Sequence, residues 1–202
     1  MTSTETIPDV RSQRPKRADA RRNYDKLIAA AREAFTEEGG SASLEEIARR
    51  AGVGIGTLYR NFPTRQDLLE AVYVEEVEAV CQTAEELMGE PPWEALVAWL
   101  HRFLAYIVTK QALAQELFSY VGHDADVFRG CRTAFYAAGD KLLVRAQQAG
   151  VVRTDVSIDD VVMLVAGISK MPSTSPEKIT RLLDIALEGL RAPAPAAGGA
   201  DR

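Results

Sequence analysis

Cysteine, histidine and long apolar runs are scarce in this sequence, and each scarcity excludes a class of protein. The 202 residues include two cysteines and two histidines, which does not suggest a disulfide-stabilised scaffold. Their spacing fits no zinc site, and the chain lacks a glycine-rich phosphate loop and a nucleophile elbow. We therefore predict no metal, no cofactor and no catalysis. No apolar run reaches the roughly 18 residues of a membrane span, and no signal-peptide block is present, so we predict a cytoplasmic protein without a membrane partner.

Charge is divided unevenly along the chain. The net charge is −5, which by itself argues against a nucleic-acid partner. Residues 1–66, however, carry 12 Lys and Arg against 9 Asp and Glu, whereas residues 67–202 carry 12 against 20. This asymmetry predicts a basic end that binds DNA and an acidic remainder that DNA would repel.

Residues 1–20 have no helical period and contain two prolines, so we predict a flexible basic arm. Basic side chains gather toward the end of this arm, at Arg11, Arg14, Lys16 and Arg17, and continue into Arg21 and Arg22. Two interpretations are open. The arm is either a solvated tail, or it contacts phosphates or the minor groove beside a docked domain.

The rest of the chain shows helical periodicity, and 47% hydrophobic residues supply enough material for a core. No strand pattern and no internal repeat is present, so the predicted fold class is all-α with about nine helices. Cap and stop signals place these helices at about residues 21–38, 43–51, 54–62, 64–88, 93–110, 112–121, 125–149, 157–170 and 176–191. The Pro/Ala/Gly-rich tail, residues 192–202, is predicted to be disordered.

Residues 43–62 read SLEEIARRAGVGIGTLYRNF, two short amphipathic helices joined by a tight glycine turn. Ser43 is expected to cap the first helix, with Glu46 as its capping-box partner. Gly52 is expected to turn the chain in the left-handed conformation. This spacing is typical of a helix-turn-helix motif, whose second helix enters the major groove of DNA.

The stretch AGVGIGTLYRNFPTRQDLLEAV resembles the signature of the TetR family of bacterial regulators. The matching residues are Gly52, Val53, Thr57, Leu58, Tyr59, Phe62, Arg65, Leu68 and Leu69, with Ala30, Ala31 and Phe35 in the preceding helix. The resemblance covers roughly residues 21–75, and residues 148–167 are more loosely similar to the family's C-terminal domain. It implies a three-helix DNA-binding domain at residues 21–66 and a larger helical domain for ligand binding and dimerisation at residues 67–191.

The resemblance also implies which residues contact DNA. Thr57 and Tyr59 would contact phosphates, and Arg65 takes the family's usual phosphate-binding basic position. Ser43 would offer a further backbone contact.

Base reading would fall to the remaining outward residues of the second helix, Ile55, Gly56, Arg60 and Asn61. Arginine can pair bidentately with guanine, asparagine with adenine, and Ile55 can touch a thymine methyl group. The alternative for Arg60 and Asn61 is phosphate contact only.

The last two predicted helices, residues 157–170 and 176–191, each carry an apolar stripe. They either pair within one chain or form a four-helix interface with a second copy. The resemblance favours the homodimer, as does the two-fold geometry that helix-turn-helix dimers require.

Aromatic residues recur at helical spacing in the regulatory half, and they are either plain core or the lining of an effector cavity. The candidate lining is Trp99, Phe103, Tyr106, Phe128, Cys131 and Phe135. His101, His123 and Arg132 are candidate polar partners for a ligand in such a cavity. An apolar pocket with few polar groups favours a small apolar or aromatic effector.

The predicted function is a sequence-specific transcriptional regulator, a repressor that binds a palindromic operator as a dimer and is released by an effector. The alternative is a helical adaptor that binds only protein. An adaptor has no need for Thr57, Tyr59, Arg60 and Arg65 beside a basic arm.

Overall fold

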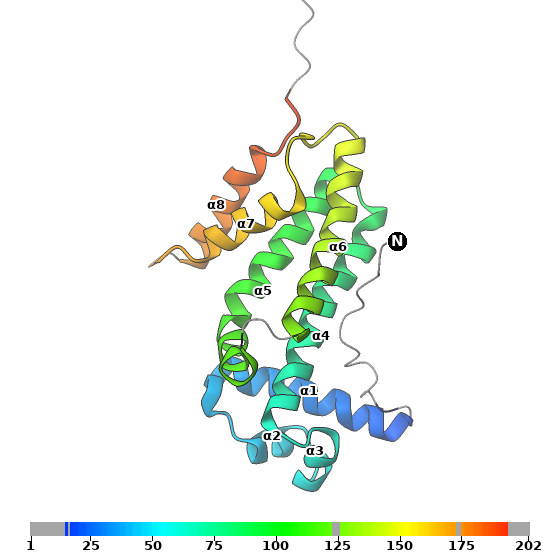
Figure 1. Ribbon diagram of the computed structural model, residues 1–202, viewed down its shortest axis with the longest axis vertical. Coiled ribbons are helices and arrows are strands. Elements are labelled where there is room, and N and C mark those ends of the chain that lie inside the picture. The colour runs from blue at the N-terminus through cyan, green and yellow to red at the C-terminus, as the bar shows by residue number, and fades with distance from the viewer. Residues whose placement is uncertain (1–14, 16, 123–125, 173–174, 194–202) are drawn as a thin grey trace, which may run out of the picture. The chain divides into compact units, whose positions relative to one another are not determined.

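The computed structural model describes residues 15, 17–122, 126–172 and 175–193. Its main elements, shown in Figure 1, are α1 (Ala18–Glu38), α2 (Leu44–Arg50), α3 (Ile55–Asn61), α4 (Arg65–Glu86), α5 (Pro92–Val121), α6 (Asp126–Gln148), α7 (Ile158–Ser169) and α8 (Pro176–Glu188). Short 3-10 turns, η2 (Gly39–Ser41) and η3 (Leu87–Gly89), follow α1 and α4. Among the described residues, extended pairing is limited to one isolated bridge between Val152 and Arg191. The all-α prediction is confirmed.

The chain divides into two compact units. The first contains residues 1–79 and 109–135, and the second contains residues 80–108 and 136–202. The helices α4, α5 and α6 therefore each contribute to both units. None of the described helices combines the length and the apolar composition that crossing a bilayer requires.

The predicted helix boundaries hold with two differences. The first helix begins at Ala18 rather than near residue 21, so the end of the predicted arm is helical. Asp19 lies in its first turn, where a carboxylate interacts favourably with the helix dipole. The rest of the arm, apart from residues 15 and 17, and most of the predicted tail lie outside the described residues.

The second difference concerns α5. The helices predicted at residues 93–110 and 112–121 are one continuous helix of 30 residues. Lys110, Gln111 and Ala112 are good helix formers, and no glycine or proline interrupts them, so the backbone has no reason to break there. α5 thus supplies residues 92–108 to the second unit and 109–121 to the first.

The first unit packs α1, α2 and α3 around a shared core. α1 buries the apolar face expected from its period, which includes Tyr24, Leu27 and Phe35. Phe62, at the end of α3, places its ring centroid 5.1 Å from that of Tyr24. Leu58 is completely buried. The three helices therefore brace one another.

The turn between α2 and α3 is the one that the sequence predicts. Gly52 has a φ of +66°, in the left-handed region that favours glycine. The backbone N–H of Val53 donates to the carbonyl oxygen of Ala48 at 3.0 Å and closes the turn. α3 consequently starts only a few residues after α2 ends.

Side chains cap the starts of three further helices. Thr64 and Asp67 exchange hydrogen bonds before α4, and Ser157 and Asp160 form a complete capping box before α7. Before α8, the Ser175 side chain accepts from the N–H of Lys178, with Pro176 as the first helical residue. These side chains satisfy backbone donors that a helix start leaves unpaired.

The second unit is built around Trp99, which is completely buried. Its indole N–H donates to the carbonyl oxygen of Val80 at 3.1 Å, so the polar atom of the ring is satisfied. Gly139 of α6 faces the ring: a Cβ atom there would lie less than 3.0 Å from Trp99 and from Ile158. Close packing of α6 against α5 requires glycine at this position.

We expect Gly139→Ala to destabilise the protein by about 1–3 kcal/mol, because the added methyl group overpacks a filled core. Thermal unfolding followed by circular dichroism measures the loss. The control is Gly56→Ala in α3, where an added Cβ meets nothing within 4 Å and helix propensity favours alanine. Equal melting temperatures for Gly139→Ala and the wild type would contradict this packing.

Candidate nucleic-acid interface

α3 presents most of its surface outward. It has seven residues, and only Leu58 among them is buried. Ile55 and Tyr59 are large side chains with exposed fractions of 38% and 45%. Gly56 is also exposed, and a Cβ there would meet open space. The exposed side of α3 therefore combines an apolar side chain, a phenol and a bare stretch of backbone.

The polar side chains at the end of α3 fold back onto their own helix. Arg60 donates from Nε to the carbonyl oxygen of Gly56 at 3.0 Å and from Nη2 to the Thr57 hydroxyl at 3.1 Å. Asn61 donates from Nδ2 to the carbonyl oxygen of Thr57 at 2.8 Å. Hydrogen bonds of this kind contribute only about 0.5–1.5 kcal/mol net, so base edges can replace them.

Ser43 caps α2 as predicted, with its hydroxyl oxygen accepting from the N–H of Glu46 at 3.1 Å. The other half of the expected capping box is absent, because the Glu46 carboxylate binds two arginines instead. Hydrogen bonds from Arg49 and then Arg50 lower the pKa of Glu46 to about 2. Glu46 therefore stays ionised in this structure, and its charge is compensated locally.

Arg50 extends this compensation to the end of α1. Its Nη1 lies 2.6 Å from a carboxylate oxygen of Glu37, and its Nη2 lies 2.9 Å from one of Glu38. Most of the acidic side chains around α2 are thus paired with arginine. Glu45 remains exposed and has no ion pair among the described residues.

Arg65, the first residue of α4, points into the protein. Its Nε and Nη2 donate to Oε1 of Glu116 at 3.0 and 2.9 Å, and its Nη1 donates to the carbonyl oxygen of Ala42 at 2.5 Å. The guanidinium also lies 5.1 Å from the ring centroid of Phe35. In this conformation the guanidinium is engaged by protein groups, and the phosphate contact that the resemblance implies stays a prediction. Glu116 has no signal in the sequence, because it lies 51 residues away.

The residues predicted to line an effector cavity are divided between the two units. Trp99 and Phe103, with parallel rings whose centroids are 6.1 Å apart, belong to the second unit, as does Tyr106. Phe128, Cys131 and Phe135 belong to the first and are buried there. Trp99 and Phe103 are buried as well, whereas Tyr106 is half-buried.

The rings in the first unit make close contacts. The Phe128 centroid is 5.0 Å from that of Tyr73 and 4.3 Å from that of Phe118. Of the candidate polar partners for a ligand, His101 pairs with Asp184 at 2.8 Å and Arg132 is exposed. His123 lies outside the described residues.

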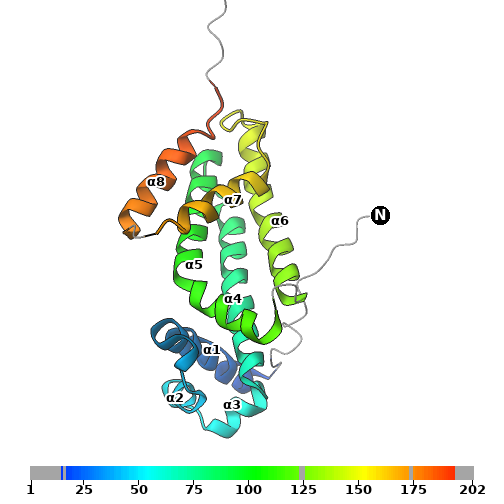
Figure 2. The ribbon, with the colours of Figure 1, turned by 60° about the vertical axis from the view of Figure 1, so that its left-hand side comes forward.

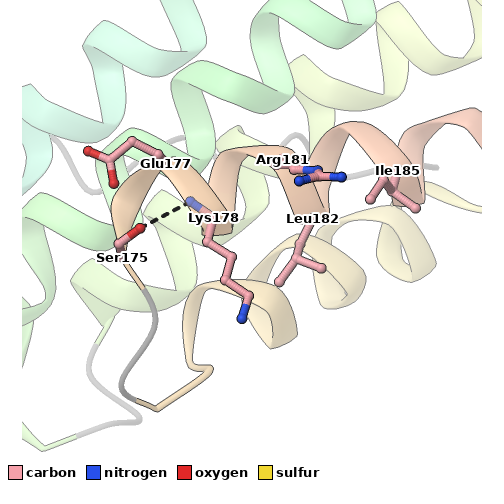
Figure 3. A pocket seen from close by; sticks show the side chains of 6 residues that line it. All are labelled: Ser175, Glu177, Lys178, Arg181, Leu182 and Ile185. Carbon is pink, nitrogen blue, oxygen red and sulfur yellow. Dashed lines mark hydrogen bonds between the residues drawn. The ribbon is translucent and has the colours of Figure 1, made fainter.

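A surface pocket with a volume of about 470 Å³ lies along α8. Its lining residues, drawn in Figure 3, are Ser175, Glu177, Lys178, Arg181, Leu182 and Ile185. All six come from α8 and its cap, and none was predicted as a ligand contact. The described residues contain no group of three or more His, Cys, Asp or Glu side chains that could hold a metal ion.

Comparison with known families and structures matches both parts of the chain. Residues 27–72 match the family described as bacterial regulatory proteins, tetR family, and residues 91–192 match the SbtR-like transcriptional regulator C-terminal domain. A TetR transcriptional regulator from Streptomyces coelicolor is 44% identical, with a TM-score of 0.74 over 84% of this chain and 99% of that one. A TetR regulatory protein from Mycobacterium vanbaalenii is 34% identical, with a TM-score of 0.74 over 88% of this chain and all of that one.

A curated relative, an HTH-type transcriptional regulator from Staphylococcus aureus, is 34% identical over 83 residues. That match covers 40% of this chain and 43% of the relative, so the chain spans less than half of the relative's length. The solved structures, by contrast, align along nearly their whole length. Two family matches in separate parts of the chain and a structural relative at 44% identity show that the chain belongs to the TetR family of transcriptional regulators, which are DNA-binding proteins and not enzymes.

Proposed function

We propose that this chain is a repressor that binds a palindromic operator as a homodimer and is released by a small effector. The observation that carries the proposal is the outward face of α3. A helix anchored by the buried Leu58 exposes Ile55, Tyr59 and Arg60 together, beside the tight turn of a helix-turn-helix. The family to which the chain belongs supports DNA as the partner of this face.

On DNA, the phosphate contacts are those of Thr57, Tyr59 and the backbone near Ser43. The 45% exposure of Tyr59 supports a hydrogen bond from its hydroxyl to a phosphate oxygen. Such contacts set the orientation of the helix on the duplex and carry no sequence information.

Base reading falls to Arg60, Asn61, Ile55 and Gly56. Arg60 and Asn61 exchange their bonds within α3 for base edges, as bidentate guanine and adenine contacts. Ile55 meets a thymine methyl group, and the bare backbone at Gly56 allows close approach.

The homodimer forms through α7 and α8, which lie side by side in Figures 1 and 2. These helices contact each other, and each buries apolar residues such as Val165 and Leu183. Their outer faces still expose large apolar side chains, including Met163 at 64% and Ile185 at 61%. Apolar surface of this kind marks an interaction site, and a second copy of the chain is its proposed occupant.

The pocket along α8 continues the same apolar surface. Leu182 and Ile185 line it, so the partner's helices would fill it on dimerisation. Two-fold pairing then presents two α3 helices to successive major grooves, about one turn of DNA apart. A palindromic operator follows from that symmetry.

The proposed effector is a small apolar or aromatic molecule that contacts the regulatory half. Its candidate contacts are Trp99, Phe103, Tyr106, Phe128, Cys131 and Phe135. The match of residues 91–192 to the SbtR-like regulator C-terminal domain supports a regulatory function for this part of the chain. The effector releases DNA by binding more tightly to a conformation in which the two α3 helices have the wrong spacing.

Selection of bound fragments from a random DNA pool tests the proposal. We expect an enriched palindrome with half-sites separated by about one helical turn, because the dimer is two-fold symmetric. No retention on any duplex at low ionic strength would remove DNA binding and favour the protein-binding adaptor instead.

Arg60→Ala is expected to relax sequence preference at one base position in each half-site. A bidentate arginine contributes about 1–3 kcal/mol of discrimination against the wrong base, and alanine makes no such contact. The measurement is competition between the selected duplex and its single-base variants. Arg129→Ala, which removes an exposed arginine from α6, is the matched control. An unchanged preference would assign Arg60 to phosphate contact alone.

The double variant Met163→Asp/Ile185→Asp is expected to sediment as a monomer of about 22.1 kDa at micromolar concentration. Carboxylates introduced there would be desolvated in the interface without a partner. Val144→Asp, at an exposed apolar position of α6, is the control and should keep the wild-type mass. A wild-type protein that sediments as a monomer would contradict the proposed dimer.

A further inference from the structure

Glu116 is a nearly buried carboxylate near the C-terminal end of α5, and its side chain is 11% exposed. Its Oε1 accepts two hydrogen bonds from Arg65, whose side chain is 19% exposed. Its Oε2 is buried and has no hydrogen-bond partner among the described residues. The charge of Glu116 is therefore compensated mainly by one guanidinium.

The same guanidinium holds the chain just before α2. Its Nη1 donates to the carbonyl oxygen of Ala42, a buried residue that directly precedes the cap Ser43. Its face lies over Phe35 of α1. One side chain thus joins α1, the start of α2, α4 and α5.

We propose that Glu116 is a positioning residue for operator binding, which fixes the helix-turn-helix through Arg65 and the carbonyl of Ala42. The inference rests on the proposed operator binding and concerns what holds α3 in a competent position. The order of contact runs from Glu116 to Arg65, then to the start of α2, and through the Gly52 turn to α3.

A phosphate contact by Arg65 does not fit this arrangement. Reaching a phosphate would require the guanidinium to leave Glu116, and removal of one partner from a buried ion pair is strongly unfavourable. Arg65 therefore acts on DNA binding through position rather than through direct contact.

The location of Glu116 allows it to transmit a structural change from the second unit to the helix-turn-helix. α5 is continuous, and residues 92–108 belong to the second unit whereas Glu116 belongs to the first. Any rearrangement that shifts this end of α5 changes the support of Arg65. Coupling of this kind typically changes affinity by about 5-fold to 150-fold.

The test measures affinity for the duplex selected by the wild-type protein, over a series of salt concentrations. Glu116→Gln is expected to weaken binding at least about 5-fold with an unchanged salt slope, because positioning is lost and phosphate contacts are kept. A purely electrostatic effect would change the affinity in the opposite direction, since removing an acid should strengthen binding to DNA. Glu33→Gln, which removes an exposed acid from α1, is the matched control and should not weaken binding.

Arg65→Gln separates the two roles of the arginine. Positioning predicts weaker binding with an unchanged slope, and no further loss in Arg65→Gln/Glu116→Gln. A phosphate contact predicts a slope smaller by about one unit. Should Glu116→Gln fail to fold, Glu116→Asp keeps the charge on a shorter side chain, and it should weaken binding without changing the slope.

Two results would overturn the inference: wild-type or tighter affinity in a folded Glu116 variant, or a reduced slope in Arg65→Gln. Either leaves the proposed function intact, provided that the wild-type protein binds the duplex. A wild-type protein that binds no duplex overturns both.

Discussion

The helix α3 is too short to be stable by itself, because isolated helices below about 12–15 residues are marginal in water. Its seven residues stay helical because Leu58 is completely buried and Phe62 packs on Tyr24 of α1. That burial also decides which residues face outward. The candidate DNA-reading face is therefore a consequence of core packing, and anything that supports α1 and α2 supports it too.

Internal ion pairs reduce the positive charge that is available to DNA. The sequence places 12 basic residues among the first 66, but several of them compensate acids of the same unit. Arg50 forms ion pairs with Glu37, Glu38 and Glu46, and Arg65 forms one with Glu116. α3 itself contains no acidic residue. The electrostatic part of DNA binding thus rests on fewer cations than a residue count indicates.

Much of the fold was predictable because its signals are local. Capping pairs such as Ser157 with Asp160, and the glycine at position 52, mark helix starts and turns within a few residues. The sequence-based prediction was wrong where a local pattern was compatible with two structures. A break was expected within α5 although no breaker is present, and a reciprocal cap was expected from Glu46, which binds neighbouring arginines instead. The predicted effector residues stay a prediction. They are divided between the two units, and all of them except Tyr106 are buried.

The positions of the helix-turn-helix elements are predictable from the sequence alone, because helical period, caps and a left-handed glycine act over distances of a few residues. The surroundings of Arg65 were decided only by the tertiary structure. Its partners Phe35, Ala42 and Glu116 come from three separate segments, and Glu116 is 51 residues away. Periodicity predicts which face of a helix is buried, but it does not predict which distant carboxylate contacts that face. For that reason the sequence predicts a phosphate contact, whereas the folded chain turns the same side chain inward.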